Sequence, residues 1–240
     1  MLPSLMGVLA KKPVSGYATT AVTFDTDYIT NASPTGIADS TKFTCSGWVK
    51  PAADGGFQSY LYTLDGRFGF IRHSDNRLSI SSQSTSGATL FSNYINATPF
   101  LAASGWTHFA ISRDSGINRW QVYINGVEDT FGTWVAGTMD FTAAGGMRFG
   151  ANNSATNFLN SDIADFYFNI GESLDLSTDI TKFIASGKPV DLGADGSTPT
   201  GTAPIIFFKG NATTFPDNLG TGGAFTVTGT LANATTSPSD

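Results

Sequence analysis

The sequence predicts an all-β fold, an antiparallel β-sandwich, and three observations lead to it. Short runs rich in Val, Ile, Phe, Tyr and Trp recur from about residue 21 onward, bounded by Gly, Asn, Asp and Pro. Within these runs apolar and polar residues alternate, as in strands that have one face buried. Helical periodicity is nearly absent, with one short exception near residues 175–185.

The first predicted strand covers residues 44–49, where alternation turns Cys45 and Val49 to one face and Trp48 to the other. Three shorter apolar runs follow, separated by residue pairs that favour tight turns. The runs are residues 60–63, 67–71 and 77–81, with Asp65-Gly66 and Asp75-Asn76 between them. This order predicts successive antiparallel hairpins.

Two longer runs, residues 105–113 and 119–127, give the strongest local strand signal. In the first run, alternation places His108 and Phe109 on opposite faces. The pair Asn125-Gly126, near the end of the second run, favours a type I′ turn. These features predict a long antiparallel pair.

The last part of the main domain holds two more strands and the one convincing helix. The strands are expected at residues 147–150 and 162–168, and the helix at residues 175–185. Asp175 or Ser177 would cap the helix, and the Gly and Pro that follow would end it.

Three regions result from this pattern. Residues 21–185 form the main sandwich domain, and residues 1–20 form an N-terminal arm. Residues 186–240 form a turn-rich extension with two strands, at 205–208 and 224–231. We expect this extension to complete the sandwich or to pack on it.

Length and composition exclude several classes of protein. The chain has 240 residues and a mass of 25.2 kDa, which suits one large domain with appendages. A net charge of -6 and a pI of about 4.7 leave no basic surface for nucleic acid. No apolar run approaches the roughly 18 residues that cross a bilayer, and the N-terminus lacks the charge order of a signal peptide. We expect no nucleic-acid or membrane partner.

The order of motifs along the chain carries a family resemblance. The motifs are residues 43–49, Gly105-Trp-Thr-His108, Val122-Tyr-Ile-Asn-Gly126, Arg148-Phe-Gly150 and Ile163-Ala-Asp-Phe-Tyr167. In this order they resemble the laminin-G-like (LamG-like), concanavalin A-like jelly rolls over about residues 21–184. In the last strand the sequence departs from the family. Ala164 stands where the first of two acidic residues is usual and only Asp165 remains, which argues against calcium or catalysis there.

The C-terminal part carries a second resemblance. Residues 187–196, Gly-Lys-Pro-Val-Asp-Leu-Gly-Ala-Asp-Gly, and the later run Asn218-Leu-Gly-Thr-Gly-Gly223 are similar to the ends of LamG-like proteins of tailed bacteriophages. This resemblance implies a structural protein of the virion.

The sequence offers no convincing catalytic group. A glycosidase needs two carboxylates that flank the scissile bond, and the only glutamates, Glu128 and Glu172, lie in separate segments. Asp162 and Asp165 are three residues apart on one predicted strand, so alternation turns them to opposite faces. We therefore assign no catalytic residue and expect a protein that is not an enzyme.

Metal and cofactor sites are likewise not assigned. The two histidines, His73 and His108, have no zinc-ligand spacing, and mid-strand His108 is expected to be packed and hydrogen-bonded. Some LamG-like proteins hold calcium at the rim of the sandwich. The resemblance leaves calcium open here, with Asp65, Asp75 or Asp162 as ligands.

Aromatic side chains suggest one candidate glycan contact, because aromatic rings stack on sugar rings. Trp48, Trp106 and Trp120 lie on predicted strands and are expected to be core. Trp134 lies outside the predicted strands and is the candidate platform, with a core or sheet-covering position as the alternative.

The leading hypothesis is a non-enzymatic bacteriophage virion structural protein, a capsid decoration or tail-associated protein on the particle surface. Its partners would be major capsid or tail proteins and further copies of itself, and it would be made in the host cytoplasm. Apolar residues of the arm would reach a neighbouring subunit; they are Leu2, Leu5, Met6, Val8 and Leu9. The alternative is a carbohydrate-binding, lectin-like module for host-surface or environmental glycans, and a third hypothesis is a glycan-cleaving enzyme.

Overall fold

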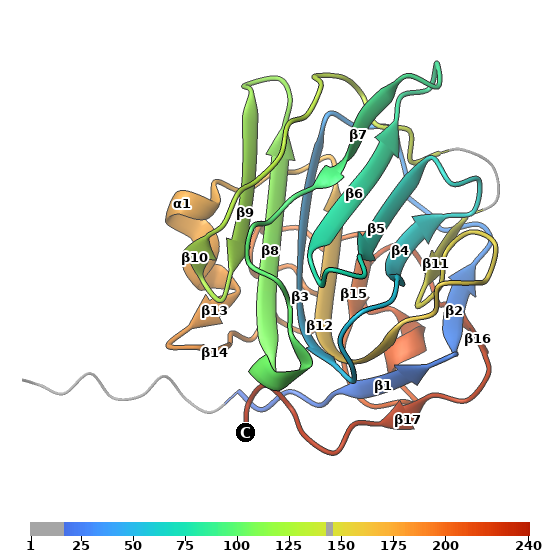
Figure 1. Ribbon diagram of the computed structural model, residues 1–240, viewed down its shortest axis with the longest axis vertical. Helices are drawn as coiled ribbons and strands as arrows, with labels where there is room; N and C mark the ends of the chain where they lie inside the picture. Colours follow the sequence, from blue (N-terminus) through green and yellow to red (C-terminus); the bar gives the residue numbers. More distant parts are fainter. Residues whose placement is uncertain (1–16, 143–145) are drawn as a thin grey trace, which may run out of the picture.

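The structure is a computed structural model that describes residues 17–142 and 146–240. Two antiparallel sheets pack face to face around the main hydrophobic core (Figure 1). The predicted all-β sandwich is therefore confirmed. Single 3-10 turns connect some of the strands, at Ala102–Ser104, Ile180–Lys182 and Phe215–Asp217.

One sheet, called sheet A here, has eight strands in the spatial order β10-β9-β8-β3-β12-β1-β17, with β15 also paired to β12. These strands are β1 (Val22–Asp25), β3 (Lys42–Pro51), β8 (Thr107–Asp114), β9 (Arg119–Ile124), β10 (Val127–Glu128), β12 (Asn160–Ile170), β15 (Ile206–Phe208) and β17 (Ala232–Asn233). Along one side of β12 lies β3, and the other side is shared by β1 and β15.

The other sheet, sheet B, has seven strands in the order β16-β2-β11-β4-β5-β6-β7. They are β2 (Tyr28–Asn31), β4 (Gln58–Thr63), β5 (Phe68–Arg72), β6 (Leu78–Gln83), β7 (Thr89–Tyr94), β11 (Met147–Phe149) and β16 (Thr226–Thr228). Strands β4 to β7 form the meander of hairpins in front in Figure 1.

The extension after residue 186 contributes to both sheets. Its strands β15 and β17 pair with β12 and β1 of sheet A, and β16 pairs with β2 of sheet B. The first sixteen residues, which include Leu2, Leu5, Met6, Val8 and Leu9, lie outside the described residues.

Aromatic side chains fill the space between the sheets. Phe70 of β5 lies 5.2 Å from Phe109 of β8, and Phe149 of β11 lies 4.7 Å from Phe166 of β12, measured between ring centroids. Each pair joins one sheet to the other and contributes about 0.5–1.5 kcal/mol beyond burial of its area. The predicted alternation is confirmed in β8, where Phe109 faces this core and His108 faces outward.

The predicted helix is present but short. It covers α1 (Leu176–Asp179), and Asp175 caps it by accepting a hydrogen bond from the Ser177 amide at 3.1 Å. A small hairpin of β13 (Ile184–Ala185) and β14 (Lys188–Pro189) follows, so the helix ends before residue 185. No helix within residues 17–142 and 146–240 has the length and apolar character to cross a membrane.

The outer face of sheet A is covered by the segment that follows β12. Tyr167 on this face packs with Leu176 of α1 and with Phe183, whose ring lies 5.4 Å from that of Tyr167. All three side chains are at most 2% exposed. This layer is a second, smaller hydrophobic core.

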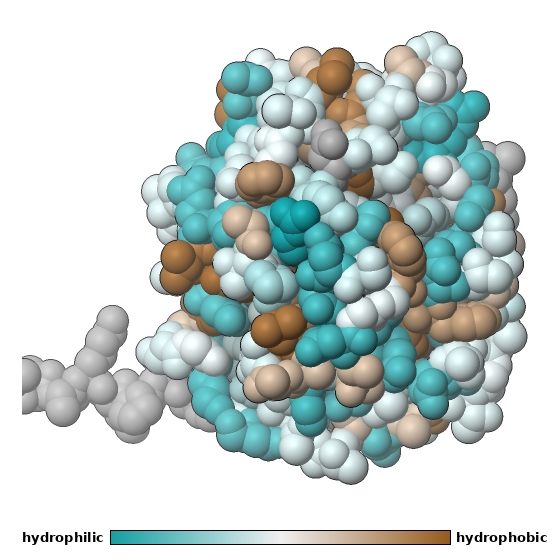
Figure 2. All heavy atoms as spheres, viewed as in Figure 1, coloured by the Kyte–Doolittle hydropathy of each residue, from teal (hydrophilic) through white to brown (hydrophobic). Residues whose placement is uncertain are grey.

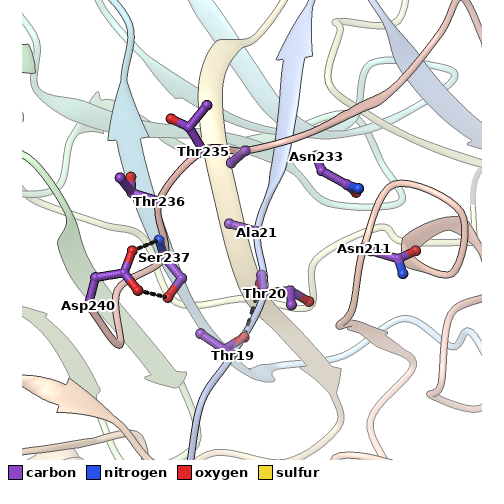
Figure 3. Close-up of a pocket in the computed structure, with 10 residues that line it drawn as sticks. Thr19, Thr20, Ala21, Asn211, Asn233, Thr235, Thr236, Ser237 and Asp240 are labelled. Atoms are coloured by element: carbon purple, nitrogen blue, oxygen red, sulfur yellow. Dashed lines mark hydrogen bonds between the residues drawn. The ribbon is translucent and has the colours of Figure 1, made fainter.

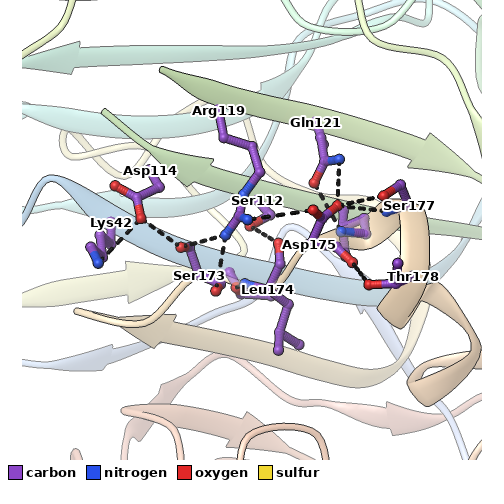
Figure 4. A network of polar contacts seen from close by, with 12 residues as sticks. Lys42, Ser112, Asp114, Arg119, Gln121, Ser173, Leu174, Asp175, Ser177 and Thr178 are labelled. Atoms are coloured by element: carbon purple, nitrogen blue, oxygen red, sulfur yellow. Dashed lines mark hydrogen bonds and ion pairs between the residues drawn. The ribbon is translucent and has the colours of Figure 1, made fainter. Parts of the chain in front are cut away.

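A polar network fastens the same segment to β9 (Figure 4). Arg119 donates to the hydroxyl of Ser173 at 2.9 Å and to its carbonyl at 3.2 Å. The Gln121 amide group donates to Asp175 at 2.9 Å and accepts from the Leu176 amide at 2.8 Å. The charged residues at this place are therefore used in holding the covering segment.

Strand β12 contains a bulge between Ala164 and Tyr167, where Asp165 has a positive φ of 46°. Ile163 and Phe166 both face the core, although strict alternation would separate them. Simple alternation therefore does not describe how Asp162 and Asp165 are oriented.

The bulge buries the carboxylate of Asp165, which is 3% exposed. It accepts hydrogen bonds from the Tyr17 hydroxyl at 3.0 and 3.2 Å and from the Thr19 hydroxyl at 2.8 Å. Burial raises the pKa of Asp165 to about 6, because it outweighs the lowering by these hydrogen bonds. Residues 17–19 are thus anchored to β12.

Candidate functional site

A shallow pocket of about 270 Å³ lies on the outer face of sheet B, over β5, β6 and β7. We call it the serine pocket, because serine is the commonest residue in its lining. The lining residues are Ile71, His73, Ser79, Ile80, Ser81, Ser92 and Tyr94. Figure 2 shows this side of the molecule, where hydrophilic and near-neutral residues prevail and hydrophobic patches are separate.

Strand register brings these residues together. Ser79 of β6 pairs with Ile71 of β5 on one side and with Tyr94 of β7 on the other, and Ser81 pairs with Ser92. Since neighbouring residues on a strand alternate in direction, the residues between them face the core. The pocket is therefore the outward half of the alternation that builds the sandwich.

Hydroxyl groups form the polar part of the serine pocket. The Ser79 hydroxyl lies 2.8 Å from His73 Nε2. No hydrogen bond joins the hydroxyl of Ser81 or Ser92 to another described residue, so both hydroxyls are available to a ligand.

His73 is a neutral hydrogen-bonding group at neutral pH. Partial burial lowers the pKa of His73. The negative charge of Asp75 raises this pKa, and the positive charge of Arg77 lowers it further. The imidazole can accept or donate one hydrogen bond at each ring nitrogen according to its tautomer. It therefore adds a polar contact but no charge to the pocket.

A row of aromatic rings, called the aromatic rim here, crosses the sheet at one end of the pocket. The ring centroid of His73 lies 4.8 Å from that of Phe57 and 4.9 Å from that of Tyr94. The Arg77 guanidinium follows, 3.8 Å from the Tyr94 ring and 5.8 Å from the Phe131 ring. Phe57 and Phe131, at the two ends, are each 47% exposed.

The charge of Arg77 is neutralised within the rim. Its guanidinium donates to Asp75 from Nε at 2.9 Å and lies 2.8 Å from it through a second nitrogen. Burial would raise the pKa of Asp75, but the hydrogen bonds from the Arg77 backbone and side chain lower it. The pair therefore remains ionised at neutral pH and presents no free charge.

Such an arrangement suits a flat ligand with many hydroxyl groups. Ring faces accept the C–H surface of the ligand, and serine and imidazole groups exchange hydrogen bonds with its hydroxyls. Within the part of the chain that the structure describes, no segment covers the outer face of sheet B as α1 and its neighbours cover sheet A, so the pocket is open to such a ligand.

A second hollow of about 420 Å³ lies between the two ends of the described chain, next to β1 and β17 (Figure 3). Its lining is mostly threonine, asparagine and serine, without an aromatic ring. Thr236 is already bonded by Lys50 and Trp106, and Asp240 by Ser237. Because the hollow has no aromatic ring in its lining and several of its polar groups are already bonded, it is the weaker candidate.

Trp134, the predicted glycan contact, is not among the residues that line the serine pocket. Its ring stacks on Phe91 at 6.4 Å, and the buried Arg113 guanidinium lies 5.1 Å from it. It is half-buried against the main core. A role for Trp134 in glycan binding stays a prediction.

The aspartates considered as calcium ligands do not converge. Asp65 pairs with Arg67, Asp75 with Arg77, and Asp162 with Lys50 and the Thr23 hydroxyl. Among residues 17–142 and 146–240, no group of three or more His, Cys, Asp or Glu could hold a metal ion.

The glutamates and the histidine considered for catalysis also lie in separate parts of the fold. Glu128 lies on edge strand β10, and Glu172 bonds Asn169 and Thr202 beyond β12. His108 is buried, bonds Ser46 at 2.9 Å and has its pKa lowered to about 3 by desolvation. This agrees with the packed position expected for it.

Sequence reasoning missed the serine pocket. Tyr94 and Phe131 lie outside the strands predicted from the sequence, whereas Tyr94 ends β7 in the structure. The available signal was the alternation of apolar residues with serines at the start of β6, in Leu78-Ser79-Ile80-Ser81. Which serines, and which ring, share a pocket depends on the register of β6 and β7.

Comparisons with known proteins give a family and a fold. The Laminin_G_3 family model, described as "Concanavalin A-like lectin/glucanases superfamily", matches residues 23–169. A candidate carbohydrate binding protein from Bacteroides ovatus has a TM-score of 0.67 at 14% identity, over 91% of this chain and 60% of its own. The native heptameric SAP-like pentraxin of Limulus polyphemus has a TM-score of 0.52 at 14% identity, over 90% of this chain and 94% of its own. No curated protein matches the chain.

Proposed function

The chain belongs to the concanavalin A-like lectin/glucanases superfamily, and we propose that it is a carbohydrate-binding domain. A sugar ring lies in the serine pocket against Tyr94 and His73, with its hydroxyls on Ser81 and Ser92. The fold shared with the Bacteroides ovatus protein, itself a candidate carbohydrate binding protein, supports this proposal.

The observation that carries the proposal is the meeting of unbonded hydroxyls with aromatic rings on an open face. Two serine hydroxyls without a partner among the described residues lie beside a tyrosine and a neutral imidazole. A protein partner would favour a larger apolar patch at its centre. A hydroxylated ring satisfies both kinds of group in the pocket at once.

We propose binding without cleavage. The residues that line the serine pocket include no carboxylate, and the nearest one described at the rim, Asp75, is held by Arg77. Glycoside hydrolysis needs two carboxyl groups across the scissile bond. The pocket therefore supplies recognition and no acid–base pair.

The virion structural role inferred from the second resemblance stays a prediction, as do the virion location, the capsid or tail partners and the homo-oligomer. The five apolar residues expected to reach a neighbouring subunit lie outside the described residues. A surface protein of a particle and a carbohydrate-binding domain are compatible, so this role would add to the proposed function.

Affinity electrophoresis tests the proposal. Native gels would contain hydroxyethyl cellulose, soluble starch, laminarin, galactomannan or polygalacturonate. We expect at least one neutral polysaccharide to retard the protein, and Tyr94→Ala to weaken this retardation about tenfold, because it removes the ring at the centre of the site.

The matched control is Tyr28→Ala, in the same sheet. Tyr28 is also half-buried and also carries an arginine, Arg148, 4.6 Å from its ring, but it lies on β2 near the other edge. Retardation by no gel, or equal loss in both variants, would contradict the proposed function.

A further inference from the structure

The aromatic rim extends well beyond the serine pocket on both sides. It begins at Phe57, just before β4, crosses the ends of β5, β6 and β7, and reaches Phe131 beyond β7. Neighbouring strands are about 4.8 Å apart, so the rim is on the order of 15–20 Å long. One sugar ring covers only part of this length.

We propose that the site takes a linear, uncharged oligosaccharide that lies across the strands, with one unit in the serine pocket and its neighbours on Phe57 and Phe131. This inference rests on the proposed function and adds the length and the charge class of the ligand.

The Phe57 end is held in place by buried and backbone groups. Arg72, fully buried, donates to the Ala53 carbonyl at 3.3 Å, and the Asn76 side chain accepts from the Gly55 amide at 2.8 Å. These bonds fix the loop that carries Phe57. A ring held in this way loses little freedom when a ligand stacks on it.

The Phe131 end is held by a backbone pairing with the residues after β7. The Phe131 amide donates to the Ile95 carbonyl at 3.0 Å, and Asn96 pairs with Thr130. The chain also turns back to β9 here, where the Thr130 hydroxyl accepts from the Val122 amide at 2.9 Å. The backbone that carries each exposed phenylalanine is therefore held in place.

The charges along the rim exclude an anionic ligand. Arg77 is paired with Asp75, and Arg72 with Asp54. Asp129, near Phe131, accepts from the Thr98 amide and adds a negative charge. An acidic sugar would meet arginines that are already paired and the negative charge of Asp129, whereas an uncharged sugar meets no such electrostatic repulsion.

Calorimetric titration with a length series tests this inference. The probes are oligosaccharides, from disaccharide to hexasaccharide, of the polysaccharide among the five that retards the protein most. We expect the hexasaccharide to bind about tenfold more tightly than the disaccharide. Phe57→Ala and Phe131→Ala should each weaken hexasaccharide binding about fivefold and leave the disaccharide unchanged.

The control variant is Leu219→Ala, another exposed apolar residue, which lies beside β15 of sheet A. It should bind every length as the unchanged protein does. Affinity that does not depend on length, or tightest binding of polygalacturonate, overturns the inference. If Tyr94→Ala still abolishes such binding, the proposed function survives; if no polysaccharide retards the protein, both fail.

Discussion

The outer faces of the two sheets differ in what their outward-pointing residues meet. On sheet A these include Trp48, Ala110 and Tyr167, which are at most 4% exposed beneath the α1 segment and the chain ends. On sheet B, Ser92 is exposed and Tyr94 is half-buried. The same alternation thus produces a third structural layer on one side and a surface for a ligand on the other.

This difference shows that the residue types at the outward positions of a strand indicate whether that face of the sheet is covered. Large apolar residues there require cover, because exposed patches of this kind are costly in a soluble protein. Serines beside single aromatic rings can stay exposed to solvent, so they remain available to a ligand. Substitutions on sheet A should therefore change stability, and substitutions on sheet B should change binding.

The largest effect is expected from Phe183→Ala beneath the covered face. Phe183 is 2% exposed and packs on Tyr167, so its removal leaves a cavity that costs about 3–5 kcal/mol of unfolding free energy. Urea denaturation would measure this. Tyr94→Ala on the open face should cost about 1 kcal/mol or less, and equal losses would remove the distinction between the faces.

Asp165→Asn should change how stability depends on pH. The pKa of Asp165 is raised from 3.8 to about 6 in the folded protein. The folded state therefore holds this proton more tightly, so its stabilising effect is complete below about pH 4 and is lost as the pH rises through 6. The loss amounts to at most roughly 3 kcal/mol.

The comparison is between unfolding free energies at several pH values from 4 to 7. The unchanged protein should lose stability over this range relative to Asp165→Asn, which cannot titrate there. Tyr17 and Thr19, which donate to Asp165, and Lys209 and Asp191 are the groups that face it. Parallel curves for the two proteins would show that this carboxylate is not the titrating group.

Trp134→Ala is expected to change stability less than Phe183→Ala does and to leave binding unchanged. The half-buried ring covers Phe91 and Arg113, so its loss should cost about 1–2 kcal/mol. Retardation in polysaccharide gels should stay as it is. Lost retardation with intact stability would move the glycan site to Trp134 and away from the serine pocket.

The sequence was sufficient for the fold where local patterns are strong. Alternation in β3 and β8 and the Asn125-Gly126 turn, with φ values of 50° and 80°, follow from local chemistry. The β12 bulge did not follow, because Asp165 is set by contacts with Tyr17 and Thr19, far away in the chain.

The candidate site was harder to predict because it is made by pairing between strands. Ser81 meets Ser92, and Ser79 meets Tyr94, only in the register that β6 and β7 adopt. A shift of β7 by one residue would turn Ser92 and Tyr94 to the core. Trp134 was selected by residue type alone, and residue type does not say whether the ring is buried.

Hydrogen exchange with and without the most strongly bound oligosaccharide tests the central claim most directly. We predict that binding slows exchange in β5, β6 and β7 and at residues 130–132, with no change over α1 and β13. Slowing confined to α1 or to the hollow between the chain ends, with β6 and β7 unchanged, would contradict the assignment of the open face as the binding face.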